Sequence, residues 1–64
     1  MKVAKNMILV KGDHSMAFSV RRRKETVEVD FYRDTYKYLS QKLSLDEGTL
    51  MYYNAIESGY KEAF

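Results

Sequence analysis

The sequence predicts an α+β fold in which a small antiparallel hairpin or meander of three strands precedes two helices, in the order β-β-β-α-α. In residues 7–31 the apolar side chains recur mainly at every second position, which is typical of half-buried strands. From Tyr32 onward the apolar period changes to that of a helix. A capping box at Ser44 and Glu47 then predicts the start of a second helix.

The first two strands are predicted from their apolar pattern and the turn between them. Met7–Val10 is apolar on both faces, as expected for a buried strand. Gly12 and Asp13 follow, and both residue types tolerate the positive φ of a tight turn. In residues 16–21 apolar and small or polar residues alternate, which predicts a second strand. We expect this strand to end near Arg22, because Arg22 would otherwise lie on its apolar face.

The third strand repeats the alternation after a charged hairpin loop at residues 21–25. One face carries Val27, Val29 and Phe31, and the other carries Thr26, Glu28 and Asp30. This pattern predicts a half-buried strand whose second face is polar.

Two apolar stripes predict the helices. The first consists of Tyr32, Tyr36, Leu39 and Leu43, and the second of Leu45, Thr49, Tyr52, Ile56 and Tyr60. The second helix has two candidate N-caps, Ser44 with its capping box and Thr49. A start at Ser44 places Gly48 inside the helix, at a cost of about 1 kcal/mol relative to alanine.

The chain has 64 residues, enough for a single small domain (residues 1–64), with a basic hairpin segment in residues 1–25 and the strand and helices in residues 26–64. A domain of this size buries only about 60% of the surface that its unfolded chain exposes. There is no cysteine and only one histidine, so neither disulfides nor a structural metal are expected, nor any cofactor. We therefore expect a homodimer. The longest apolar run has four residues, far short of the ~20 of a membrane helix, so we expect a cytoplasmic protein with no membrane contact.

Charge is sorted along the chain. Residues 1–24 carry seven bases and one acid, whereas residues 25–64 carry four bases and eight acids. A basic half beside an acidic half favours a polyanionic partner for the first and a different role for the second.

Candidate contact residues gather in the basic half. The candidate nucleic-acid contacts are Lys11, Arg21, Arg22, Arg23 and Lys24, with Lys11 expected near the others across the hairpin. Arginine binds phosphate oxygens in a bidentate way, and several such contacts give salt-dependent affinity. A solvated loop that blunts a sheet edge would have the same composition.

The six tyrosines all lie in the second half of the chain. Tyrosine is enriched at protein interfaces because it adds apolar area and keeps a polar group. Tyr38 and Tyr53 lie off the predicted core stripes and are therefore the candidate protein-interface residues.

No pattern indicates an enzyme or a small-molecule substrate. His14 lies between Asp13 and Ser15, but sequence adjacency does not make a catalytic triad. The three glycines form no phosphate-binding loop.

The order of strand, helix, tight turn and helix in residues 26–64 resembles the ribbon-helix-helix DNA-binding family. The apolar spacing that carries the resemblance is Leu39, Leu43 and Leu45, followed by Leu50–Met51 and Ala55–Ile56. The resemblance implies that two chains pair their strands into an antiparallel ribbon that enters the DNA major groove, with four helices forming the dimer core. Members of that family are mostly repressors and antitoxins.

The resemblance also implies that Thr26, Glu28 and Asp30 face the bases. Two acids per strand would then meet a polyanion, so the resemblance holds only if the ribbon serves dimerisation and the basic segment before it contacts DNA. Family members often have a glycine between the helices, where this chain has Ser44.

Three functions remain after this reasoning. The first is a small, dimeric transcriptional regulator that binds nucleic acid, with DNA preferred, through the basic hairpin. The alternative is a protein-binding modulator or inhibitor, such as a phage-type small protein or an adaptor, that acts through the Tyr-rich acidic half. The third is a structural subunit of a larger assembly.

Overall fold

The computed structural model describes residues 5–63, which form a five-stranded sheet and one α-helix. The strands are β1 (Met7–Lys11), β2 (His14–Arg21), β3 (Thr26–Arg33), β4 (Tyr36–Ser44) and β5 (Lys61–Glu62). The helix α1 (Leu45–Glu57) follows β4 directly, and the 3₁₀ turn η1 (Arg22–Lys24) joins β2 to β3.

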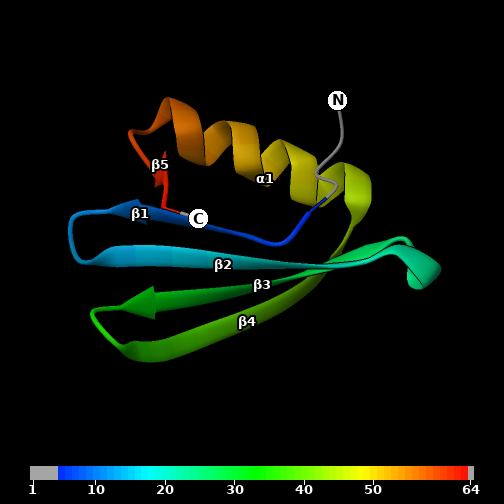
Figure 1. Ribbon diagram of the computed structural model, residues 1–64, viewed down its shortest axis with the longest axis horizontal. Coiled ribbons are helices and arrows are strands. Elements are labelled where there is room, and N and C mark those ends of the chain that lie inside the picture. Colours follow the sequence, from blue (N-terminus) through cyan, green and yellow to red (C-terminus); the bar gives the residue numbers. More distant parts are fainter. Residues whose placement is uncertain (1–4, 64) are drawn as a thin grey trace.

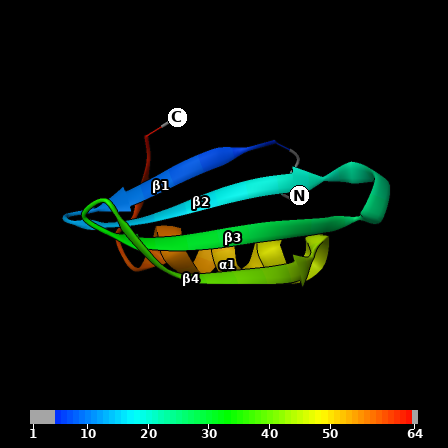
Figure 2. The same cartoon turned by 90° about the horizontal axis from the view of Figure 1, so that it is seen from below.

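The fold has two layers, a twisted antiparallel sheet and the helix that packs on one of its faces (Figures 1 and 2). The strand order is β4-β3-β2-β1-β5. After α1 the chain turns back, and the short β5 pairs with β1. One edge of the sheet is therefore the two-residue β5, and the other is the nine-residue β4.

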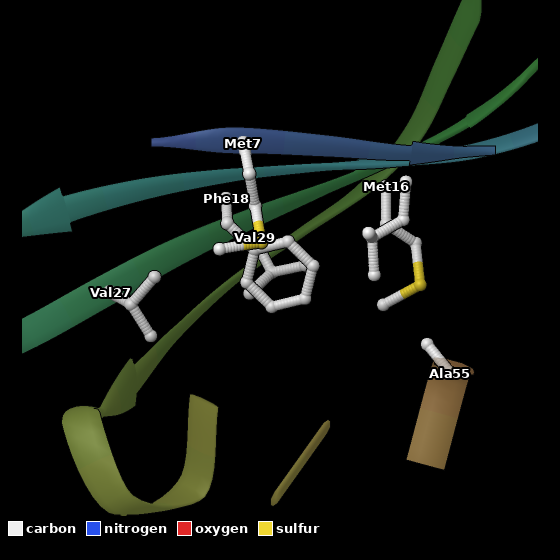
Figure 3. Close-up of a cluster of buried hydrophobic side chains, with 7 residues drawn as sticks. Met7, Met16, Phe18, Val27, Val29 and Ala55 are labelled. Carbon is white, nitrogen blue, oxygen red and sulfur yellow. The ribbon is translucent and has the colours of Figure 1, made fainter. Parts of the chain in front are cut away.

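Strand register separates the side chains into two sets. Residues directly opposite each other on antiparallel strands share a face, so Phe18 and Val29 lie together on the face toward the helix. The core lies between this helix face and α1. Its buried residues are Met7, Leu9, Met16, Phe18, Val27, Val29 and, on α1, Ala55. Figure 3 shows Met7, Met16, Phe18, Val27 and Val29 projecting from the strands to the side of the sheet on which Ala55 of α1 lies. The second face, which we call the open face, has no helix of the described residues over it.

The predicted strands in the first half are confirmed. The turn between β1 and β2 is Gly12–Asp13, with Gly12 at a φ of 61°. Strand β2 ends at Arg21, and β3 buries Val27 and Val29 as the alternation requires.

The predicted first helix is wrong, because Tyr36–Ser44 is the strand β4. Pairing with β3 is regular from Ser44 back to Leu39, opposite Phe31, but the next pair joins Tyr32 to Lys37. Tyr38 is therefore the extra residue of a β-bulge. The bulge adds one residue to the alternation of β4, so the apolar residues Tyr36, Leu39 and Leu43 are spaced by three and four instead of by two. That spacing is the one expected for a helix.

The predicted β-β-β-α-α order and the ribbon-helix-helix-like dimer are both overturned by this arrangement. The ribbon of that family is a strand whose only neighbour is the same strand of a second chain. Here β3, the strand expected to form the ribbon, lies between β2 and β4 and is paired along both edges. The chain also has one α-helix among its described residues, where the resemblance requires two.

The capping box at the start of α1 is confirmed. The Ser44 hydroxyl accepts from the Glu47 backbone N–H at 3.1 Å, and the Ser44 N–H donates to the Glu47 carboxylate at 3.2 Å. Thr49 is thus inside the helix rather than at its N-cap, and its hydroxyl donates to the Leu45 carbonyl.

Gly48 lies where the helix approaches the sheet. A Cβ atom added there would overlap Cγ1 of Val27, a side chain with no exposed surface. The glycine that appeared as a cost in the sequence is thus the residue that lets the helix lie close to β3.

Candidate functional site

The candidate site is the basic turn, which we define as residues Arg21–Lys24 between β2 and β3. Arg21 ends β2, and the next three bases form η1. Glu25 closes the turn in the left-handed conformation at a φ of 52°, and its N–H donates to the Arg22 carbonyl at 3.2 Å. Its own carbonyl accepts from the Leu45 N–H at 3.2 Å, which ties the turn to the start of α1.

The bases of this turn are exposed, and most of their charge is uncompensated. All four side chains belong to exposed residues. In the described part of the chain, Arg21, Arg23 and Lys24 form no ion pair, and neither does the adjacent Glu25. The basic turn therefore presents a concentrated positive charge to solvent at one end of the sheet.

A shallow hollow of about 230 Å³ lies beside the turn on the open face. It is lined by Arg21, Lys24, Thr26, Glu28 and Lys42. The strand register explains this grouping, because Arg21 is opposite Thr26 and Glu28 is opposite Lys42. Three bases surround one acid, so the hollow has a net positive charge and hydrogen-bond donors for an anion.

Lys11 lies far from the basic turn. It ends β1 opposite His14, whereas the turn begins at Arg21, the other end of β2. The seven residue steps between His14 and Arg21 correspond to roughly 24 Å of strand. The structure thus separates Lys11 from the four bases that the sequence analysis grouped with it.

The position of Lys11 gives it a structural role. Its ammonium donates to the Ser58 carbonyl at 2.5 Å and lies 5.9 Å from the centre of the Tyr60 ring. It therefore satisfies a carbonyl just after the C-terminus of α1 and holds the return to β5 against β1.

The two candidate interface tyrosines lie on different elements. Tyr38 is the bulge residue of β4, is 53% exposed and has its ring 6.4 Å from that of Phe31. Tyr53 is on α1, is 42% exposed and meets the Tyr52 ring edge-on at 5.3 Å. Asn54 is on the side of α1 that faces β4, where Tyr38 lies. Tyr53 is the neighbouring residue and points about 100° away from Asn54 around the helix. The two tyrosines therefore do not form one surface.

Sequence reasoning missed Lys42, because it assigned Lys42 to a helix. A usable signal existed in residues 39–44, where Ser40, Lys42 and Ser44 alternate with Leu39, Gln41 and Leu43. Read as a strand, that alternation places Lys42 on the same face as Glu28.

The described residues show no cluster of side chains for metal binding. His14 and Arg33 lie 3.6 Å and 3.5 Å from the Asp13 carboxylate, in a half-exposed cluster at the turn end of the sheet. Within residues 5–63 no three histidine or acidic side chains are placed to hold a metal ion. No helix in that range is long and apolar enough to cross a membrane.

Comparisons of the chain with protein-family models, with characterised proteins and with solved structures found no match.

Proposed function

We propose that the chain is a small regulator that binds the phosphate backbone of nucleic acid through the basic turn, with Lys42 as an additional contact. The observation that carries the proposal is the exposed and unpaired charge of Arg21, Arg23 and Lys24 on one turn. A basic run neutralised by neighbouring acids would have no charge left for a phosphate. Here Glu25 and Glu28, the nearest acids in sequence, form no ion pair with it in the described residues.

Backbone contact fits this surface better than reading of bases. Proteins that stack bases on a sheet present aromatic side chains at its centre. The centre of the open face instead carries Glu28 and Asp30, and Asp30 accepts a hydrogen bond from the Ser40 hydroxyl at 2.6 Å. These acids repel phosphates and confine the nucleic acid to the end of the sheet with the basic turn. We therefore expect little sequence preference.

The test is a fluorescence anisotropy titration of a labelled random-sequence duplex DNA at several salt concentrations. The first variant combines Arg21→Gln, Arg23→Gln and Lys24→Gln. The matched control combines Arg33→Gln, Lys37→Gln and Lys61→Gln, which removes the same charge from exposed residues away from the turn.

We expect micromolar binding at low salt, with a slope of log K against log salt of about −0.9 for each phosphate neutralised. The turn variant should bind at least about tenfold more weakly, a loss of roughly 1.4 kcal/mol. The control should lose less than about threefold, the part due to net charge. Equal losses in both variants, or no binding at low salt, would mean that the turn is a solvated loop.

A protein partner is the second candidate, and a different observation favours it. Large apolar residues are exposed on β4 and α1, with Tyr36 at 72%, Tyr38 at 53% and Leu50 at 62%. Such residues are typical of protein interfaces. A chain that ignores nucleic acid at low salt would act through this surface.

A further inference from the structure

The helix face of the sheet is covered unequally, and the uncovered part lies along β4. Near β1 the edge of the sheet is closed by β5 (Figure 1). The half-buried Tyr60, just before β5, packs on the core. Near β4 no segment within residues 5–63 closes the edge, and Leu39 is 45% exposed although it points to the helix face. A groove of about 300 Å³ remains between β4 and α1.

The groove and the edge beside it are largely apolar. The groove is lined by Leu43, Glu47, Leu50, Met51 and Asn54. Beside it, Tyr38 and Leu39 both lie on the helix face, because the bulge turns two successive side chains of β4 to one side. The strand is paired only with β3, so its other edge carries unpaired backbone N–H and C=O groups.

We infer that a second copy of this chain covers the groove by pairing its β4 antiparallel to β4 of the first, about a two-fold axis at Gln41. The seam then continues both sheets into one, and the two helices flank it on the same side. The inference does not depend on the proposed nucleic-acid contact, since Arg21, Arg23 and Lys24, which carry that proposal, lie outside the seam and only Lys42 borders both surfaces.

The register follows from the side chains. An axis at Gln41 places Leu39 opposite Leu43 of the second copy, twice, so four leucines meet on the helix face between the two grooves. An axis at Lys42 would instead place two lysines directly opposite each other, which is unfavourable. An axis at Ser40 would place Leu39 opposite the polar Gln41.

Charges on the open face also match in this register. Lys42 is next to Glu28 of its own chain, and across the seam it is opposite Ser40 of the second copy. The hydroxyl of that serine donates a hydrogen bond to Asp30 on β3 of the same copy. Each lysine therefore lies between a carboxylate of its own chain and one of the second copy, and the arrangement is repeated by the two-fold axis. Lys37 and the bulge, which protect the start of the edge, lie at or beyond the limit of the paired segment.

The apolar area at the seam is that of a weak dimer. Tyr38, Leu39 and Leu50 are exposed to 53%, 45% and 62%, which together is about 1.6 residues per copy. At about 200 Å² for a large side chain this gives roughly 640 Å² for the pair, before the strand edge and lysine stems are counted. Weak complexes have interfaces below about 1,200 Å² in total.

The first test is sedimentation equilibrium of the full chain over a range of concentrations up to about 1 mM, a range that covers weak complexes. We expect a monomer–dimer equilibrium that Leu39→Glu weakens about tenfold or more. The matched control is Ile56→Glu, since Ile56 is 37% exposed on the side of α1 away from β4. This control should change the dimer dissociation constant less than about twofold, which is within the scatter of a surface substitution.

The second test stands even if Leu39→Glu does not fold. Because the chain has no cysteine, a single introduced thiol can form a disulfide only between copies. Gln41→Cys should oxidise rapidly to a covalent dimer, because the two thiols face each other across the axis. Lys37→Cys on the same strand should not, because its thiols are separated by roughly eight residue steps, or about 27 Å.

Three results would overturn the inference. One is a monomer at every concentration. Another is a dimer that survives Leu39→Glu or is lost in Ile56→Glu. The third is equal cross-linking of the two cysteine variants.

Discussion

Replacing Gly48 by alanine should destabilise the protein, although alanine is the better helix former. The added Cβ would overlap Cγ1 of Val27 and lie 3.4 Å from its Cβ, whereas carbon atoms prefer contacts of about 3.5–4.0 Å. Val27 has no exposed surface, and its branched side chain has few alternative rotamers. The helix must therefore move away from β3 or the valine must take a strained conformation.

Two opposing effects set the magnitude. Overpacking of a core costs typically about 1–3 kcal/mol. The higher helix propensity of alanine returns about 1 kcal/mol. We therefore expect Gly48→Ala to lower the free energy of unfolding by up to about 2 kcal/mol, measured by urea denaturation followed by far-UV circular dichroism.

A double-mutant cycle isolates the overlap as the cause. Val27→Ala alone should cost about 2 kcal/mol through the cavity it leaves. It also removes the Cγ1 atom that Gly48→Ala meets, so in that background Gly48→Ala should be neutral or stabilising. The expected coupling is the overpacking cost itself, about 1–3 kcal/mol. A single Gly48→Ala variant more stable than the parent would refute this explanation of how α1 seats on the sheet.

Three further substitutions test individual contacts. Ser44→Ala removes the capping box and should lower the free energy of unfolding by about 1 kcal/mol in urea denaturation. Lys11→Met removes the hydrogen bond to the Ser58 carbonyl, so it should cost about 0.5 kcal/mol in the same assay and leave duplex affinity unchanged. Glu28→Gln removes the acid from the hollow beside the basic turn, and it should raise duplex affinity about threefold at low salt in the anisotropy titration. An affinity that falls in Lys11→Met, or does not rise in Glu28→Gln, would contradict the placement of the site.

The parts of the fold that the sequence predicted are those with strong local signals. Strand β1 is a continuous apolar run, β2 and β3 alternate without interruption, and the capping box at Ser44 and Glu47 is a local interaction between residues three apart. Such patterns need no information about distant segments.

The part that was predicted wrongly depends on a long-range pairing. Tyr36, Tyr38, Leu39 and Leu43 all turn toward the helix face only because the pairing of β4 with β3 contains a bulge. Without the register, three of these positions, Tyr36, Leu39 and Leu43, fit the stripe of a helix together with Tyr32. The two-residue β5 carries no periodic signal at all, and its pairing with β1 follows from the path of the chain after α1.

The members of the candidate site were predicted only where they are neighbours in sequence. The four bases of the turn are adjacent in sequence and stay adjacent in the structure. The separation of Lys11 from them, and the arrival of Lys42 beside them, are consequences of strand direction and register. Neither follows from spacing along the chain.

Chemical-shift mapping of the ¹⁵N-labelled protein with a short duplex at low salt tests the central claim most directly. We predict that the amide signals that move are those of residues 21–26 and 42–44, around the basic turn and its hollow, and that they return as salt is added. Shifts centred on Tyr38, Leu39 and Leu50 would place the contact on the β4 groove instead. Unchanged spectra at low salt would contradict nucleic-acid binding by this chain.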